Sequence, residues 1–306
     1  MRTLSQPALA DLADVPALSR WVRSGGLRLH VLDYGGDGVP LVVLPGITSP
    51  AITMDFVARE LTSVARPIVV DVRGRGLSDS APAYTVDNYA DDTEAVVTTL
   101  GLDRPVLLGH SMGARIAAVT AARKSLPLRG SVLVDPPLSG PDRGPYPTSL
   151  AVFDEQLAQA RRGTTADEVA LSWPRWPHRE QELRARWLAS CDAEAIAATH
   201  RGFETDDFFT VWPSVPAPVA LLHGADSPVV PPEGVRELAA SNPSARLFEV
   251  PDAGHMVFWD NPRPALALLL DALAAVWGEG GGGRDGGSGR SSHAGPRAST
   301  TPRHAR

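Results

Sequence analysis

Residues 106–113 read VLLGHSMG, and residues 114–122 continue as ARIAAVTAA. The first stretch is an apolar run that ends in G-x-S-x-G, and the second is rich in alanine and favours a helix. Glycines at positions 109 and 113 leave room for the tight strand-to-helix turn on which a nucleophilic serine is presented. The positive end of the following helix then lies beside Ser111. The stretch therefore predicts an α/β protein in which Ser111 is a nucleophile.

The segments on either side of this turn alternate between strand-like and helix-like patterns. Short apolar runs predict strands at Leu27–Tyr34, Pro40–Leu44, Pro67–Asp71, Pro105–Gly109, Ser131–Asp135, Pro218–His223 and Arg246–Val250. Helical patterns lie between them at Ile52–Ser63, Val86–Leu100, Met112–Lys124, Pro232–Ser241 and Pro264–Trp277. This order predicts a mostly parallel, twisted sheet flanked by helices.

The alternation stops in one long segment, residues 139–212. This segment contains amphipathic helical patterns and no clear strand, so we expect a helical cap inserted into the core. We expect its tryptophans to pack the cap against the core rather than to contact substrate. The predicted division is an N-terminal extension at 1–19, an α/β core at 20–138 and 213–277, the cap at 139–212, and a disordered Gly/Ser/Arg-rich tail at 278–306.

Composition excludes several classes of protein. The net charge is −6 and residues 1–277 hold no block of like charge, which argues against a nucleic-acid binder. The single cysteine, Cys191, rules out a disulfide within the chain and disfavours a cysteine-based zinc site. The N-terminus lacks a signal-peptide pattern, and the longest apolar run, Ala265–Val276, is too short to span a membrane. We therefore expect a cytoplasmic protein with a small-molecule substrate and no membrane or nucleic-acid partner; the oligomeric state is not predicted.

A serine nucleophile needs a base and an acid that orients the base. His255 is the predicted base, because it lies in a loop between the last strand and the last helix. Two aspartates compete for the role of acid. Asp226 follows the penultimate strand but comes one residue before the usual position, which Ser227 occupies, whereas Asp135 ends the strand after the one that delivers Ser111. We favour Asp135 and keep Asp226 as the alternative.

Two backbone amides are predicted to stabilise the oxyanion. One is the amide of Met112, directly after the nucleophile. The other is the amide of Ile47, in the loop Pro45–Ser49, where Gly46 allows close approach of the backbone.

The motifs together resemble a known family. The similarity to the α/β-hydrolase superfamily extends over residues 20–277. It is carried by four separate motifs: the Pro-Gly loop at 45–46, DVRGRGLS at 71–78, GHSMG at 109–113 and AGH at 253–255. The segments LPGITSPAITM (44–54), GHSMGARIA (109–117) and VDPPLSGPDRGPYP (134–147) further resemble the N-formylmaleamate deformylases of aerobic nicotinate degradation. The terminal extensions are not part of that pattern.

The resemblance implies Ser111, Asp135 and His255 as nucleophile, acid and base. It also implies that a formyl-serine intermediate releases formate without a metal or an organic cofactor. An acidic substrate requires a nearby cation, and Arg73, Arg115 and Arg143 are candidates because they lie in or beside the motifs.

Three other functions stay open. They are a general carboxylesterase with the same triad, a perhydrolase-type haloperoxidase, and a ligand-binding protein on this fold that has lost turnover.

Overall fold

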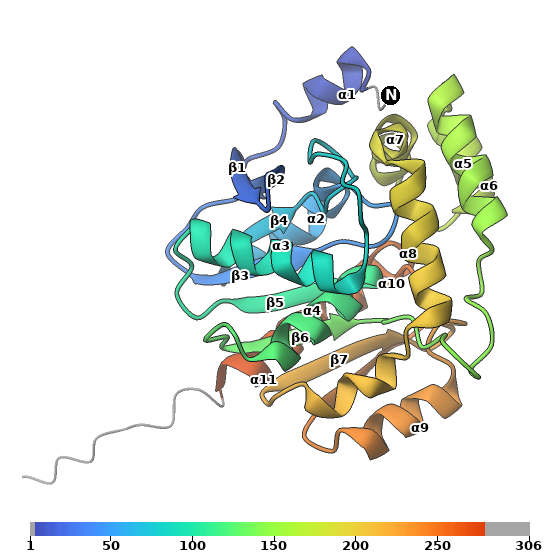
Figure 1. Ribbon diagram of the computed structural model, residues 1–306. Coiled ribbons are helices and arrows are strands. Elements are labelled where there is room, and N and C mark those ends of the chain that lie inside the picture. Colours follow the sequence, from blue (N-terminus) through green and yellow to red (C-terminus); the bar gives the residue numbers. More distant parts are fainter. Residues whose placement is uncertain (1–3, 279–306) are drawn as a thin grey trace, which may run out of the picture.

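The computed structural model describes residues 4–278, and these form an eight-stranded sheet covered by helices on both faces (Figure 1). The strand order is β1-β2-β4-β3-β5-β6-β7-β8. β1 and β2 pair antiparallel with each other, β2 pairs antiparallel with β4, and the remaining pairs are parallel. The strands are β1 Leu18–Ser24, β2 Leu27–Asp33, β3 Val39–Leu44, β4 Ala65–Val70, β5 Val106–His110, β6 Gly130–Val134, β7 Val219–Gly224 and β8 Arg246–Val250.

The prediction of a mostly parallel, helix-flanked sheet is confirmed, and all seven predicted strands form within two residues of their expected ends. The sequence patterns did not identify β1. This edge strand buries only Val22 and Ser24, so it lacks the continuous apolar run that marks a strand covered on both faces.

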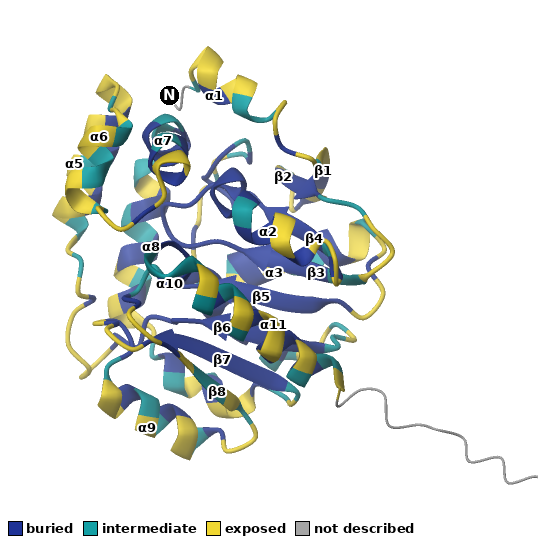
Figure 2. Cartoon of the chain, turned by 180° about the vertical axis from the view of Figure 1, so that it is seen from behind, coloured by how far each residue is buried: buried dark blue, intermediate teal, exposed yellow. Residues whose placement is uncertain are grey.

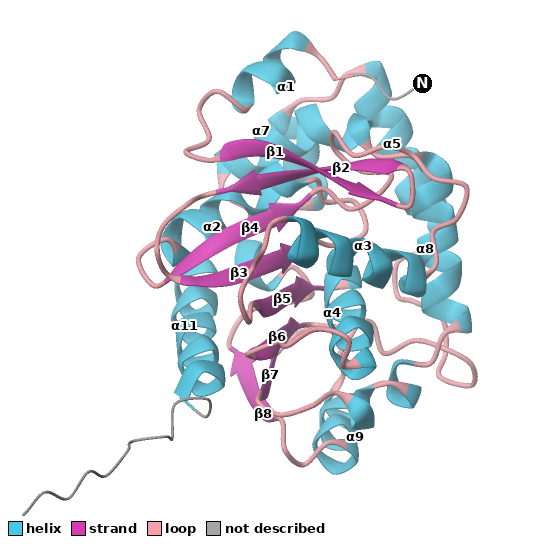
Figure 3. Cartoon of the chain, turned by 60° about the vertical axis from the view of Figure 1, so that its left-hand side comes forward, coloured by secondary structure: helices cyan, strands magenta, loops and turns pink. Residues whose placement is uncertain are grey.

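Helices cover the two faces unequally (Figure 3). α3 Val86–Thr99, α4 Met112–Arg123 and α9 Pro232–Ser241 lie on one face, and α2 Asp55–Leu61 and α11 Pro262–Gly278 lie on the other. Successive residues of β5 point to opposite faces of the sheet. Leu107 belongs to the hydrophobic core on the side of α3 and α4, and Leu108 belongs to the core on the side of α2 and α11. The central strands are buried along their whole length (Figure 2).

The segment between β6 and β7 is helical, and we call it the cap. It comprises α5 Leu150–Arg162, α6 Ala166–Ser172, α7 His178–Trp187 and α8 Ala193–Thr205, with short 3₁₀ turns at Leu188–Ser190, Phe208–Thr210 and Trp212–Ser214. Local signals begin two of these helices, because Thr165 forms a capping box with Glu168 and the Asp192 side chain caps α8. The cap lies at the carboxyl ends of the central strands (Figure 3).

The N-terminal residues contact the cap. α1 Gln6–Asp11 packs against α7, and Asp11 accepts hydrogen bonds from Arg186 and from Nε1 of Trp187. The short helix α10 Val257–Asp260 precedes α11, and a 3₁₀ turn at Ala51–Met54 precedes α2. Within residues 4–278 no helix is both long and apolar enough to cross a membrane. The predicted disordered tail, apart from Gly278, lies outside the described residues.

Candidate active site

Ser111 lies on the turn between β5 and α4, in a backbone conformation that few side chains adopt. Its φ is 56° and its ψ is −117°, and the residue is buried. The flanking glycines are required by close backbone contacts. A Cβ at Gly113 would overlap the carbonyl oxygen of Leu44, and one at Gly109 would overlap the carbonyl of Gly113. The turn therefore fits only because both positions lack a side chain.

His255 lies in the loop between β8 and α10, and its ring contacts Ser111, which follows β5. Its Nε2 is 2.9 Å from the Ser111 hydroxyl oxygen, and its Nδ1 is 2.7 Å from Oδ2 of Asp135. An ionised carboxylate can only accept hydrogen bonds, so Nδ1 carries the proton and Nε2 presents its lone pair to the serine hydroxyl. This is the arrangement in which an imidazole can remove a serine proton.

Asp135, rather than Asp226, contacts the histidine. Asp135 directly follows β6 and is 0% exposed. Its carboxylate also accepts hydrogen bonds from the amide of Gly224, at 3.0 Å, and from the hydroxyl of Ser227, at 2.6 Å. Asp226 is exposed. Ser227, at the position where the sequence pattern would place an acid, thus holds the carboxylate that comes from the neighbouring strand.

His110, the residue before the nucleophile, supports the histidine loop. Its Nε2 lies 3.0 Å from the carbonyl oxygen of His255, and burial lowers the pKa of His110 to about 4. The ring is therefore neutral at neutral pH, and Nε2–H donates to that carbonyl. Its ring also lies beside Trp259, at a centroid distance of 5.5 Å. His110 is in this way a positioning residue for His255.

The two predicted oxyanion donors lie beside the serine. Within residues 4–278, no acceptor forms a hydrogen bond with the amide of Ile47 or with that of Met112. A Cβ at Gly46 would lie 3.5 Å from Cβ of Ser111, so the loop that carries Ile47 packs directly on the nucleophile. Neither amide is therefore committed to an acceptor within the described residues, as an oxyanion donor requires.

Ser111 and His255 open into a small cavity of about 50 Å³ between the core and the cap. Its wall is formed by core loops and by aromatic and polar side chains of the cap: Gly46, Ile47, Thr48, Ser49, His110, Ser111, Tyr146, Thr148, Phe153, Gln156, Trp173, Trp176, Arg184, His255 and Met256. A cavity of this size admits only a small molecule. In the described part of the chain, no group of three or more His, Cys, Asp or Glu side chains is placed to hold a metal ion.

The tryptophans of the cap divide between packing and the cavity. Trp187 and Trp212 are almost completely buried, as expected for packing between cap and core. Trp173 and Trp176 instead stack on each other, with ring centroids 4.8 Å apart, and both line the cavity. For these two residues the expectation of packing alone was incomplete.

Tyr146 is a cavity residue that the sequence analysis quoted but did not single out. Its hydroxyl lies 3.2 Å from Nε2 of His255. Burial raises the pKa of the Tyr146 phenol above its ordinary value, so the group keeps its proton at neutral pH. A phenol in this position can accept a hydrogen bond from the imidazole once the imidazole is protonated.

Arg184 is a cation at this cavity that the sequence analysis did not name. It lies on α7, is 7% exposed, and lines the same cavity as Ser111. The signal that could have found it is its helical position, because Leu183 and Trp187 form the buried face of α7 and Arg184 lies on that face with them. A charged residue on the buried face of a helix requires a partner or a ligand.

The three arginines proposed from sequence do not line this cavity. Arg73 forms a buried ion pair with Asp92, at 2.6 Å. Arg143 pairs with Asp207 and Glu237 on the surface. Arg115 donates to the carbonyl oxygens of Pro137, Ser139, Gly202 and Asp206, and so ties α4 to the cap. Each of them already has structural partners, and the sequence pattern alone could not reveal those partners.

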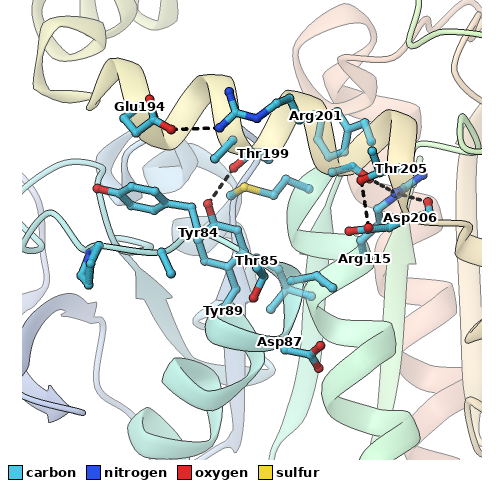
Figure 4. A pocket seen from close by; sticks show the side chains of 18 residues that line it. Tyr84, Thr85, Asp87, Tyr89, Arg115, Glu194, Thr199, Arg201, Thr205 and Asp206 are labelled. Carbon is cyan, nitrogen blue, oxygen red and sulfur yellow. Dashed lines mark hydrogen bonds and ion pairs between the residues drawn. The ribbon is translucent and has the colours of Figure 1, made fainter.

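A larger crevice of about 540 Å³ lies between α8 and the α3–α4 side of the core (Figure 4). Neither Ser111 nor His255 lines it. Its charged groups are engaged with other groups, as in the ion pair between Arg201 and Glu194 at 2.9 Å. The crevice is therefore separate from the candidate nucleophile.

Comparisons with known proteins agree with the fold described above. The model of the alpha/beta hydrolase fold family matches residues 39–262. An N-formylmaleamate deformylase of Pseudomonas putida is 40% identical over 260 residues, which cover 84% of this chain and 94% of the relative. A 2-(acetamidomethylene)succinate hydrolase of Mesorhizobium japonicum is 28% identical over 286 residues, which cover 87% and 99%. The crystal structure of an N-formylmaleamic acid deformylase from Pseudomonas putida has a TM-score of 0.78 at 38% identity and covers 84% of this chain and 100% of that one.

Proposed function

This chain belongs to the α/β-hydrolase fold family, and we propose that it removes the formyl group of N-formylmaleamate, a small acidic amide, through a serine nucleophile. It is a deformylase-like α/β-hydrolase, as its 40% identity to the Pseudomonas putida enzyme indicates. The observation that carries the proposal is the contact chain from Ser111 through His255 to Asp135, with distances of 2.9 and 2.7 Å.

The first half of the reaction forms an acyl-enzyme. Nε2 of His255 takes the hydroxyl proton of Ser111 as the serine oxygen bonds to the formyl carbon. The negative charge that develops on the formyl oxygen is stabilised by the amides of Ile47 and Met112, each worth about 3 kcal/mol in sites of this kind. The Asp135 carboxylate stabilises the positive imidazolium.

Collapse of this intermediate breaks the bond between the formyl carbon and nitrogen. Nε2–H of His255 gives its proton to the leaving nitrogen, so maleamate departs and Ser111 carries a formyl ester. A water molecule then attacks the ester carbon while His255 takes one proton from it. Cleavage of the ester returns that proton to the Ser111 oxygen and releases formate.

The direct test is formate release from N-formylmaleamate. We expect the native chain to release formate and maleamate in equal amounts and Ser111→Ala to release neither, with an unchanged unfolding temperature. Ser63→Ala is a matched control, because Ser63 is exposed and its hydroxyl donates, within residues 4–278, only to the carbonyl of Glu60. Its activity should equal that of the native chain.

Two results would replace the proposal. Rapid hydrolysis of p-nitrophenyl acetate without formate release from formylated amides would identify a general carboxylesterase. A native chain that neither turns over a substrate nor reacts at Ser111 with a fluorophosphonate would be a ligand-binding protein on this fold.

A further inference from the structure

The cavity of Ser111 contains a buried positive charge that no carboxylate of the described residues neutralises. The guanidinium of Arg184 donates to Oγ1 of Thr48, at 3.2 Å, and to Oε1 of Gln156, at 2.8 Å. Both acceptors are neutral. Burial lowers the pKa of Arg184 to about 10, which still leaves the side chain charged at neutral pH. A buried charge is costly unless an opposite charge joins it.

Arg184 also differs from the other buried arginines. Arg73 has Asp92 as its partner. Arg75 and Arg115 lack a carboxylate partner among residues 4–278, but their guanidinium groups are satisfied by several backbone carbonyls, with hydroxyls added at Arg75. Among the described residues Arg184 has two acceptors, both neutral side chains, and of these four arginines it is the one that lines the cavity of Ser111.

The ring of Trp176 lies beside this arginine and carries a second donor. Nε1 of Trp176 is buried and has no hydrogen-bond acceptor within the described residues. The guanidinium carbon of Arg184 lies 5.9 Å from the ring centroids of both Trp173 and Trp176. The two indoles hold the planar guanidinium in place, and this limits the freedom that it must lose on binding a ligand.

The contact with Thr48 places this cation close to the chemistry. Thr48 directly follows Ile47, one of the two proposed oxyanion donors, and Gly46 of the same loop packs on Ser111. A short molecule can therefore reach both Ser111 and Arg184 through one small cavity.

We propose that Arg184 and Nε1–H of Trp176 form a carboxylate-binding subsite that selects small acyl compounds with a free carboxylate. This inference rests on the proposed function, because it assigns the end of the substrate that is not cleaved. The carboxylate accepts hydrogen bonds from the guanidinium and the indole, and this fixes the position of the formyl carbon at Ser111.

The test compares two substrates that share the scissile bond. N-formylmaleamate carries a carboxylate, and N-formylacetamide does not. We expect Arg184→Met to lower the ratio of kcat/KM for the acid to kcat/KM for the neutral compound by about 100-fold or more, since a buried partner of a charged group is lost. Trp176→Phe removes the N–H donor together with the five-membered ring of the indole, and we expect it to lower the same ratio by about tenfold, as for the loss of one hydrogen bond to a charged group.

A matched control comes from the separate crevice. Arg201→Met also removes one cation from the cap, but Arg201 is exposed and lies in the crevice of Figure 4, so the ratio should stay unchanged. Maleate should inhibit the native chain competitively and raise its unfolding temperature, and Trp176→Phe should weaken both effects. This measurement keeps the proposal testable if Arg184→Met does not fold. An unchanged ratio in folded Arg184→Met, or no effect of maleate on the native chain, overturns the subsite.

Failure of the subsite and failure of the deformylase assignment look different. If the native chain releases formate but Arg184→Met keeps the native ratio, the reaction stands and the subsite falls. If the native chain releases no formate, while maleate still slows fluorophosphonate labelling of Ser111 in a way that requires Arg184, the subsite stands and the deformylase assignment falls.

Discussion

Replacing Asp135 with asparagine changes the charge and donor pattern at the histidine while it keeps the size of the side chain. The amide of Gly224 can only donate, so it holds the amide oxygen of the new asparagine. The NH₂ group then faces Ser227 and Nδ1 of His255. Nδ1 must present its lone pair, the ring proton moves to Nε2, and Nε2 can no longer accept the proton of Ser111. We expect kcat to fall about 10⁴-fold, or about 5.5 kcal/mol of barrier, with little change in KM.

The assay is formate release at substrate saturation, with thermal unfolding as the check that the fold is intact. Asp226→Asn is the matched control, because it makes the same chemical change at an exposed aspartate one residue from Ser227. Its kcat should stay within about twofold of the native value, as expected for a surface change away from the site. Near-native activity in Asp135→Asn together with a large loss in Asp226→Asn would refute the reasoning.

Three further outcomes are expected. Gly113→Ala should destabilise the fold by about 1–3 kcal/mol, since the new methyl group would overlap the carbonyl of Leu44; a native denaturation midpoint would contradict this. Tyr146→Phe should lower kcat about tenfold with KM little changed, because the phenol oxygen can accept from His255 only after the ring is protonated; a rise in KM alone would indicate a binding role. Burial raises the pKa of Glu180 in the folded chain from 4.5 to about 7. The folded chain therefore binds this proton more tightly than the unfolded chain, and the resulting stability is complete below pH 4.5 and is lost as the pH rises through 7. Glu180→Gln should therefore stabilise the chain at pH 8 by at most about 3 kcal/mol and not at pH 4.5, and an equal gain at both pH values would contradict this.

Much of the core was predictable because its signals are local. The apolar runs of the central strands and the two glycines around Ser111 each report a constraint that acts within a few residues. The edge strand β1 was missed for the same reason, since a mostly exposed strand carries no such run.

Local sequence patterns could not decide which aspartate is the partner of His255. The sequence narrowed the acid to Asp135 or Asp226, and both follow buried strands. Which carboxylate contacts His255 depends on how the ends of β6, β7 and β8 lie beside one another. In the structure Ser227 occupies the conventional position and donates to Asp135.

The sequence by itself predicted the mostly parallel sheet and the turn that carries Ser111, because periodicity and the backbone requirements of adjacent residues encode them. The resemblance of its motifs gave the fold family, and chain order gave the loop of His255. Only the tertiary structure decided which arginine lines the cavity. Arg73 and Arg115 lie in or beside recognisable motifs but are bound by partners distant in sequence, whereas Arg184 reaches Thr48 across 136 positions and finds no described carboxylate. The availability of a charge for a ligand is set by what else packs around it, and that is a property of the folded chain rather than of any short segment.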